Sequence, residues 1–246
     1  MNITIVIPTY NEADNVRPMT EALLRLGLPT SNVLVVDDDS PDGTGRIADQ
    51  LAAEHPGTIH VLHRTGQRGL GRAYIDGFQW ALEHAADAIV QMDCDFSHAP
   101  GDVPRLVGPL PEYVPGAGSR YVKGGEVAED WEFRRELLSW WANLYARAIL
   151  GSSLLDITGG FRAWRRETLE GINLGAIRSQ GYIFQVEMAY AATRLGYSVL
   201  EVPIRFEERQ LGESKMSMSV KIEAAIGVWK IWWRHHHLEP GDRQTV

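Results

Sequence analysis

The sequence VLVVDDDSPDGT, at residues 33–44, joins a short apolar run to a dense group of acidic and turn-forming residues. A run of this length, rich in β-branched residues and ended abruptly by polar ones, is typical of a strand buried on both faces. Three more runs have the same character, at residues 3–7, 59–62 and 88–92. Segments with the length and spacing of helices lie between the runs, at about 14–26, 42–54 and 70–84. Strands that alternate with helices predict a parallel, doubly wound α/β sheet over residues 1–108.

The second half of the chain has a less regular pattern. We expect helices there at 131–150 and 181–195, a strand at 198–206 and an amphipathic helix at 217–237. No internal repeat and no linker-like stretch separates the two halves. The sequence therefore predicts one domain over residues 1–215, with halves at 1–108 and 109–215, and then an amphipathic helix and tail at 216–246.

The composition excludes several classes of protein. With 246 residues, 44% of them hydrophobic and 23% charged, the chain has the make-up of an ordinary globular protein. Its formal net charge of -8 argues against nucleic acid as a partner of the whole surface. Cys94 is the only cysteine, so no internal disulfide can form and a cytoplasmic location is expected. No stretch without a charged residue exceeds eleven residues, so we expect neither a membrane span nor a signal peptide.

Acidic side chains stand at the ends of three of the expected strands. They lie within residues 8–12, 37–43 and 93–95. The carboxyl ends of parallel strands are where open α/β sheets bind ligands. Many like charges in one place cost free energy unless a cation or hydrogen-bond donors offset them, so a shared binding site explains the grouping. The alternative is that these residues cap and turn the following helices, and it stays open above all for Asp42.

Asp93 and Asp95 are the candidate metal ligands. One residue separates them, so in extended backbone both side chains point to the same side and can share a cation. Carboxylate oxygens favour Mg²⁺ or Mn²⁺, and such ions commonly hold substrate phosphates as well. Cys94, between the two, is expected to be a small buried side chain. The segment GQRGLG at 66–71 is not a dinucleotide fingerprint and no P-loop motif occurs, so neither hydride transfer nor P-loop chemistry is indicated.

Six motifs together resemble a known family. IPTYNE (7–12), VVDDDSPDGT (35–44) and MDCDFSH (92–98) resemble the nucleotide-sugar segments of inverting GT-A glycosyltransferases of family 2. GSRYVKGG (118–125), TGGFR (158–162) and RQLGESK (209–215) look like segments of the dolichol-phosphate, or polyprenol-phosphate, mannose synthases. The resemblance implies a GT-A (Rossmann-like) fold, in which a mostly parallel sheet is flanked by helices and C-terminal amphipathic helices follow. It also implies that residues 1–108 bind the nucleotide sugar and residues 109–215 bind the acceptor.

The resemblance further implies the substrates. They would be GDP-mannose as donor and a polyprenyl (dolichyl) monophosphate as acceptor, as in a dolichyl-phosphate β-D-mannosyltransferase, with Mg²⁺ or Mn²⁺ as cofactor. The residues that would hold the guanosine are Pro8, Tyr10, Glu12 and Asp38. Those that would surround the metal and the diphosphate are Asp93, Asp95 and Ser97, and the family often has Gln at the place of Ser97.

The remaining roles fall on the second half of the chain. By the same resemblance, Arg209 and Lys215 would close over the donor diphosphate, and Arg120, Arg135 and Ser139 would receive the acceptor phosphate. The catalytic group would then comprise Asp95, Arg120, Arg209 and Lys215. Where relatives commonly carry Arg-Gly, this chain has Trp140 and Trp141.

A lipid phosphate makes simpler demands on an enzyme than a hydroxyl acceptor does. A phosphate monoester has a second pKa of about 6, so it is largely anionic at pH 7 and needs no general base. The protein must supply in-line placement, neutralisation of the departing GDP and cations that bring two anionic substrates together. The arginine and lysine residues of the catalytic group suit this demand by their charge.

Tryptophans and cations stand together in two helical segments. One is residues 131–141, and the other contains Trp229, Lys230, Trp232, Trp233 and Arg234. This mixture is typical of a helix that lies in the membrane interface, so we expect peripheral attachment at the cytoplasmic face. The alternative is packing in the core or against a membrane-anchored partner subunit, which would use the same surface. Consecutive helical residues cannot face one ion, so the HHH run at 235–237 is expected to be a solvated helix end.

Three other functions fit part of this pattern. A polyprenyl-phosphate glucosyltransferase or aminosugar transferase would share the motifs and use another nucleotide sugar, although such relatives usually carry C-terminal membrane spans. A glycoside hydrolase would use Asp93 and Asp95 as acid and nucleophile and would tolerate a chelator. A non-catalytic nucleotide-sugar-binding subunit would bind GDP-mannose without turnover.

Overall fold

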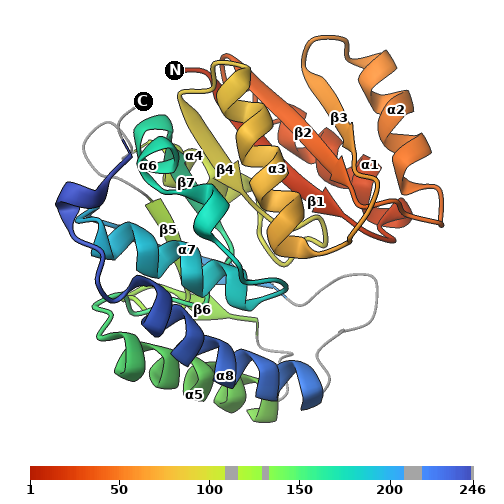
Figure 1. The fold of residues 1–246 in the computed structure, drawn as a ribbon. Helices are drawn as coiled ribbons and strands as arrows, with labels where there is room; N and C mark the ends of the chain where they lie inside the picture. Colours follow the sequence, from red (N-terminus) through yellow and green to blue (C-terminus); the bar gives the residue numbers. More distant parts are fainter. Residues whose placement is uncertain (109–115, 129–132, 208–217, 245–246) are drawn as a thin grey trace.

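The computed structural model describes residues 1–108, 116–128, 133–207 and 218–244, with the side chains of 133–136 and 218–222 excepted. Within these residues, seven strands form the central sheet: β1 (Ile3–Thr9), β2 (Ser31–Asp37), β3 (Ile59–His63), β4 (Ala88–Gln91), β5 (Gly116–Ser119), β7 (Arg162–Arg165) and β8 (Leu200–Pro203). Their order is β3-β2-β1-β4-β7-β5-β8 (Figure 1). Neighbouring strands are parallel except at β7, which is antiparallel to β4 and β5. The predicted α/β fold with a mostly parallel sheet is confirmed.

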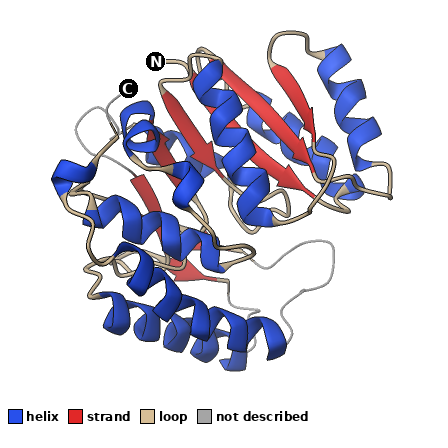
Figure 2. Ribbon diagram, viewed as in Figure 1, coloured by secondary structure: helices blue, strands red, loops and turns tan. Residues whose placement is uncertain are grey.

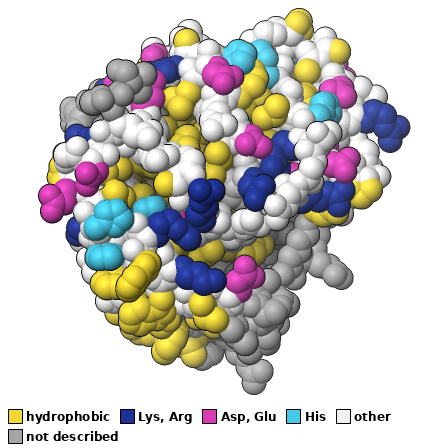
Figure 3. All heavy atoms as spheres, viewed as in Figure 1, with side chains coloured by type: hydrophobic (Ala, Val, Ile, Leu, Met, Phe, Trp, Pro, Cys, Tyr) yellow, Lys and Arg dark blue, Asp and Glu magenta, His cyan; other side chains and the backbone are white. Residues whose placement is uncertain are grey.

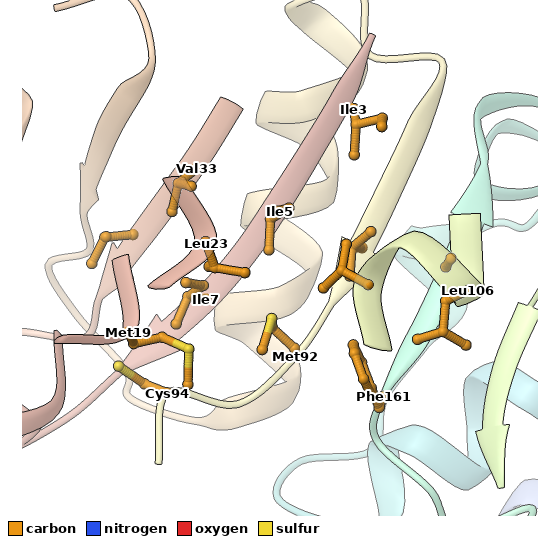
Figure 4. Packing of buried hydrophobic residues seen from close by; sticks show 14 of the residues in the cluster. Ile3, Ile5, Ile7, Met19, Leu23, Val33, Met92, Cys94, Leu106 and Phe161 are labelled. Atoms are coloured by element: carbon orange, nitrogen blue, oxygen red, sulfur yellow. The ribbon is translucent and has the colours of Figure 1, made fainter. Parts of the chain in front are cut away.

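Helices cover both faces of this sheet (Figure 2). The helices described are α1 (Ala13–Leu24), α2 (Thr44–Glu54), α3 (Leu70–Glu83), α4 (Val103–Val107), α5 (Phe133–Leu150), α6 (Arg166–Gly171), α7 (Ile183–Arg194) and α8 (Met218–His235), of which α5 and α8 do not lie on the sheet. The side chains of β1 alternate between the faces. Ile5 and Ile7 pack with Met19 of α1 (Figure 4), whereas Val6 packs in a second cluster with Phe78 of α3. Burying one such side chain contributes about 1.5–3 kcal/mol, so the sheet is a firm support for the loops at its edge.

A third layer lies outside α7. There α5 and α8 run side by side (Figure 1), and Ala146, Tyr190 and Ile231 of the three helices share one buried cluster. The hydroxyl of Tyr145 donates to the backbone oxygen of Ala225 at 3.1 Å, which ties α5 to α8. Among the helices that the structure describes, none has the length and hydropathy needed to cross a membrane.

Glu187 of α7 anchors the end of α8. Its wholly buried carboxylate accepts a hydrogen bond from Arg234, and Nε2 of His235 lies 2.8 Å from the same oxygen. Burial alone would raise the pKa of Glu187, but the bonds from His235 and Ser179 and the charge of Arg234 lower it to about 2. The expectation of a solvated helix end is therefore wrong for His235, which is 4% exposed.

The structure corrects some expected boundaries. The four strands predicted in the first half are β1 to β4, and the helix expected from residue 42 begins at Thr44. The strand expected at 198–206 is divided, because β8 ends at Pro203, which has no N–H for a ladder. Its last part, β9 (Arg205–Phe206), pairs with β6 (Glu126–Val127) in a separate sheet. The boundary proposed after residue 215 lies outside the described residues.

Candidate active site

The ends of β1 and β2 are joined by hydrogen bonds between their loops. The parallel pairing of β1 with β2 and β4 brings three carboxyl ends to one edge of the sheet. There the backbone N–H of Asp38 donates to the backbone oxygen of Thr9 at 3.0 Å, and the backbone N–H of Glu12 donates to the hydroxyl of Thr44 at 2.9 Å. Pro8 is buried within β1 itself. Pro8, Glu12 and Asp38, which were predicted to bind the nucleotide sugar, therefore lie at the same joined pair of strand ends.

Asp42 has the role of a turn residue. Its carboxylate accepts the backbone N–H groups of Ala13 and Thr44, each at 3.0 Å, and the Thr44 hydroxyl at 2.6 Å. Partial burial would raise the pKa of Asp42, but these bonds lower it below its ordinary value. Of the two interpretations left open for Asp42, the structure supports helix and loop capping.

Asp38 is held by a segment that sequence reasoning did not connect with it. One carboxylate oxygen accepts a hydrogen bond from Arg64, and the other accepts the backbone N–H of Gly69 at 2.7 Å. Arg64 also donates to Asp76 of α3 at 2.6 Å. The GQRGLG segment, which carries no dinucleotide fingerprint, thus lies against the candidate nucleoside site. Arg64 and the glycines of this segment, shortly after the strand predicted at 59–62, were the signal that could have indicated this.

Arg68 of the same segment covers Tyr10. Its guanidinium carbon lies 4.7 Å from the centre of the Tyr10 ring, and its Nη1 donates to the Tyr10 hydroxyl at 2.9 Å. It also donates to the carboxylate of Asp39 at 2.9 Å. Asp39 has a left-handed φ of 56°. An exposed guanidinium therefore stands over one of the predicted nucleoside contacts.

The acidic pair after β4 lies on a tight turn. Asp93 accepts a hydrogen bond from the hydroxyl of Tyr74 at 2.8 Å, and its own N–H donates to Nδ1 of His98 at 3.1 Å. Asp95 accepts the N–H of Ser97 at 3.1 Å and the Ser97 hydroxyl at 2.6 Å. Asp95, Ser97 and His98 are all buried. The predicted metal ligands are therefore held in place by neighbouring side chains.

The backbone at this turn differs from the extended form that the spacing argument assumed. β4 ends at Gln91, and Phe96 has a left-handed φ of 61°. The chain also bends at Cys94 and Asp95, so it is not fully extended between the two carboxylates, and their sharing of a cation stays a prediction. Cys94 packs in the core cluster as expected. Burial raises the pKa of the Cys94 thiol well above its ordinary value, which makes it a poor metal ligand.

Arg120, after β5, forms a buried ion pair that the sequence did not reveal. Its Nε and Nη2 donate to the two carboxylate oxygens of Asp156, both at 2.7 Å. Nη2 also donates to Thr158 at 2.9 Å, and Nη1 donates to the hydroxyl of Ser139 at 3.3 Å. Burial opposes charge on both partners, but their attraction holds the pKa of Asp156 below and that of Arg120 above the ordinary values. The structure thus brings Arg120 and Ser139 together.

The loop that carries Asp156 is fixed from both sides. Asn143 of α5 accepts the N–H of Ile157 at 3.0 Å and donates to the backbone oxygen of Leu155. Glu201 of β8 accepts the N–H groups of Leu155 and Asp156 at 2.7 and 2.8 Å. Asp156 therefore holds Arg120 at a fixed place beside α5.

Three predicted site residues lie where the structure gives no side chain. Arg135 is in the first turn of α5, and its side chain is outside the described set. Arg209 and Lys215 fall in 208–217, which is also outside it. The chain reaches this segment beside the acidic turn, because the N–H of Glu207 donates to the backbone oxygen of Ser97 at 3.1 Å.

The ligand atoms at the acidic turn suit a hard cation whose remaining coordination positions are filled by a substrate. Asp93, Asp95 and Ser97 offer only oxygen atoms. In the described part of the chain, no group of three or more His, Cys, Asp or Glu side chains is arranged to hold a metal ion. Mg²⁺ is typically bound by one or two carboxylates, with water and substrate phosphates at its other positions. The residues present therefore fit Mg²⁺ or Mn²⁺ bound together with a diphosphate.

The fold and the arrangement of acidic turns define a class of enzyme, the glycosyltransferases. Residues 4–172 match the family described as Glycosyl transferase family 2, and the chain belongs to this family. It is 50% identical over 228 residues to undecaprenyl-phosphate mannosyltransferase of Micrococcus luteus. The aligned residues cover 93% of this chain and 93% of that one. It is 48% identical over 225 residues to polyprenol monophosphomannose synthase of Mycolicibacterium smegmatis, covering 91% of this chain and 84% of that one. The resemblance to the polyprenol-phosphate mannose synthases is confirmed.

Solved structures agree on the fold. Glucosyl-3-phosphoglycerate synthase of Mycobacterium tuberculosis, in complex with Mn²⁺, UDP and glucosyl-3-phosphoglycerate, is similar with a TM-score of 0.67 at 18% identity. The similarity covers 96% of this chain and 80% of that chain. The complex of the same enzyme with phosphoglyceric acid gives the same TM-score. The GT-A fold is therefore confirmed.

Proposed function

We propose that this protein transfers mannose from GDP-mannose to a polyprenyl monophosphate, with inversion at the anomeric carbon. The observation that carries the proposal is the 50% identity, over 93% of the chain, with a protein named for the same sugar and the same acceptor class. GDP as the nucleotide and inversion rest on the motif resemblance. Residues 1–108 are proposed to bind the donor and residues 109–215 to bind the acceptor. Residues 216–246, with the C-terminal helix, are proposed to form part of the surface that faces the membrane.

The donor's nucleoside is proposed to bind at the ends of β1 and β2. Pro8, Tyr10, Glu12 and Asp38 would hold the guanosine. A carboxylate has about four acceptor sites, so Asp38 can accept N–H groups of guanine besides the hydrogen bonds from Arg64 and Gly69. Arg209 and Lys215 are proposed to reach the diphosphate from the segment that begins beside Ser97.

The donor diphosphate is proposed to lie over the acidic turn. Asp93 and Asp95 would hold the divalent cation, with Ser97 fixing Asp95 through their 2.6 Å hydrogen bond. When bound, this cation neutralises charge on the departing GDP.

The acceptor phosphate is proposed to bind beside α5. Arg120, Arg135 and Ser139 would receive it, and the Nη1 group of Arg120 that faces Ser139 is the donor not committed to Asp156. A phosphate oxygen attacks the anomeric carbon, a new C–O bond forms, and the bond from that carbon to GDP breaks. No proton needs to move, because the phosphate is already anionic. Attack from the side opposite GDP inverts the configuration.

A donor panel tests the assignment of the sugar nucleotide. The protein is incubated with Mg²⁺, a short-chain polyprenyl phosphate and, in separate reactions, GDP-mannose, GDP-glucose, UDP-glucose and UDP-N-acetylglucosamine. We expect product with GDP-mannose and its loss on addition of a chelator. Product with a UDP-sugar only would favour the glucosyltransferase or aminosugar alternative. GDP-mannose binding without product from any donor would favour a non-catalytic subunit, and sugar release that tolerates the chelator would favour a hydrolase.

An exposed apolar face on α5 and α8 is proposed to rest on the membrane surface. It consists of Leu137, Leu138, Trp140, Trp141 and Leu144 of α5 with Ile226, Trp229 and Trp233 of α8, all of them exposed. Hydrophobic side chains gather over this region at the lower left of Figure 3. A shallow groove of about 430 Å³ on α8 is lined by apolar residues together with Lys230 and Arg234. A lipid acceptor makes such a surface necessary, and the reducing compartment expected from the single cysteine favours the cytoplasmic face.

The tryptophans of α8 differ in exposure. Trp229 and Trp233 are 56% and 75% exposed, whereas Trp232 packs against the cluster shared by α5, α7 and α8. Replacing Trp229 and Trp233 by Ser should weaken co-sedimentation with anionic vesicles by about tenfold or more, since burying one large apolar side chain is worth about 1.5–3 kcal/mol. Transfer to a soluble short-chain acceptor should be unchanged.

Trp232→Ser is the contrasting variant. It should lower the melting temperature, because it removes a side chain that packs against the buried cluster shared by α5, α7 and α8. If the Trp229 and Trp233 variant instead loses its cooperative melt, these residues support the fold and the membrane assignment is wrong. Vesicle binding that appears only when a membrane protein of the same cell is added would assign the face to a membrane-anchored partner subunit.

A further inference from the structure

Two side chains outside the predicted site hold Asp93, one through its carboxylate and one through its backbone N–H. The hydroxyl of Tyr74, on α3, donates to Oδ1 of the Asp93 carboxylate at 2.8 Å. Nδ1 of His98, on the far side of the acidic turn, accepts the backbone N–H of Asp93 at 3.1 Å. One contact restrains the rotation of the carboxylate, and the other restrains the peptide that carries it.

Tyr74 is itself immobilised by packing. It is wholly buried, and its ring lies parallel to that of Phe184 of α7, with centroids 5.8 Å apart and planes 5° apart. The ring of Phe78 lies 5.9 Å away on the same helix. The hydroxyl therefore has a fixed position, and its bond to a carboxylate is of the strong, charge-assisted kind.

His98 is fixed by the acceptor half of the chain. It is 2% exposed and its ring stacks on Phe161 at 4.9 Å, with the ring of Phe206 against its edge at 5.6 Å. Because Nδ1 accepts a hydrogen bond, the hydrogen-bond pattern assigns the ring proton to Nε2. The acidic turn is thus tied on one side to α3 and on the other to Phe161, directly before β7, and to Phe206 of β9.

We propose that Tyr74 and His98 are positioning residues, which fix Asp93 in the orientation that a divalent cation requires. The inference rests on the proposed function, because it takes Asp93 as a ligand of that cation. Partners that orient metal ligands typically change metal affinity or activity by about 10- to 100-fold when they are removed. Neither residue needs to contact the cation or the substrates for this effect.

Tyr74→Phe is the direct test, because it removes one oxygen and keeps the stacked ring. Binding of Mn²⁺ is measured by electron paramagnetic resonance titration in the presence of GDP, so that the readout does not depend on turnover. We expect Mn²⁺ binding about 10- to 100-fold weaker than in the wild type. The matched control is Tyr197→Phe, which also removes a single donated bond, from the Tyr197 hydroxyl to the backbone oxygen of Glu167 at 3.1 Å. The control should bind Mn²⁺ as the wild type does.

Failure of the proposed cation site and failure of the positioning role of Tyr74 give different results. If the wild type binds no Mn²⁺ with GDP, the cation site of the proposed function falls and this inference falls with it. If the wild type binds Mn²⁺ and Tyr74→Phe binds it equally well, the inference on Tyr74 alone is overturned. A lowered melting temperature with unchanged Mn²⁺ affinity would likewise assign Tyr74 to the core only.

A pair of variants tests His98 in the same way. His98→Asn keeps an oxygen that can accept the N–H of Asp93, and His98→Leu keeps apolar bulk without an acceptor. Both lose the stacking on Phe161, so their stabilities should fall together. We expect the Asn variant to bind Mn²⁺ more tightly than the Leu variant, by about tenfold. Equal affinities would overturn the positioning role of His98.

Discussion

Asp95→Asn protein is expected to fold normally and to transfer mannose at least about 10²-fold more slowly than the wild type. The substitution removes one charge from the proposed cation site, where losing a stabilising group costs a few kcal/mol in the transition state. The Asn oxygen can still accept the N–H and hydroxyl of Ser97, so the turn should keep its shape. Initial rates at saturating GDP-mannose and lipid phosphate, together with a thermal melt, measure the two effects.

The matched control for this variant is Asp49→Asn. Asp49 is an exposed carboxylate of α2 that lies 2.9 Å from Nε2 of His63, away from the proposed cation site. Its variant should keep full activity. Turnover at the wild-type rate by folded Asp95→Asn protein would remove the acidic turn from the active site.

Arg120→Met is expected to lose both stability and acceptor binding. Met retains apolar bulk but leaves the carboxylate of Asp156 buried and unpaired, which costs about 3–5 kcal/mol in the free energy of unfolding. Loss of a charge-assisted bond to the acceptor phosphate, worth about 1.5–3 kcal/mol, should raise the KM for lipid phosphate by about tenfold or more. The KM for GDP-mannose should change little. Chemical denaturation and steady-state kinetics give these quantities.

The double variant Arg120→Met with Asp156→Asn separates the two effects. It removes both charges of the pair, so part of the lost stability should return. The return should be incomplete, because Asp156 also offsets the charge of the buried Arg162. The acceptor KM should stay high, because the guanidinium is still missing. If acceptor affinity returns with stability, Arg120 acts only by holding the fold. If calorimetry shows an equal loss of GDP-mannose binding, Arg120 belongs to the donor side.

The sequence was informative where its pattern is strong. The runs that became β1 to β4 are apolar and β-branched, and strands buried on both faces demand that composition. β5 reads GAGS and β7 reads RAWR, and neither has a strand pattern. These two are strands because they complete the sheet, so tertiary pairing overrides their weak local preference.

The candidate site was predictable only in part. Acidic residues at strand ends indicate a ligand edge, because topology places those ends together. Ion pairs between distant segments leave no comparable signal, as with Arg64 and Asp38, or Arg120 and Asp156. Local spacing also does not show that the chain bends at Cys94 and Asp95. Such features depend on the folded arrangement and not on nearby sequence.

In the proposed reaction, the lipid phosphate itself attacks the sugar. The direct measurement is mass spectrometry of both products after incubation of the protein with GDP-mannose, Mg²⁺ and a short-chain polyprenyl phosphate. We expect a lipid monophosphate that has gained one hexose, together with free GDP in equal amount. A lipid diphosphate sugar with release of GMP would show attack at phosphorus, and free mannose with unchanged lipid would show hydrolysis. Either result would contradict the account.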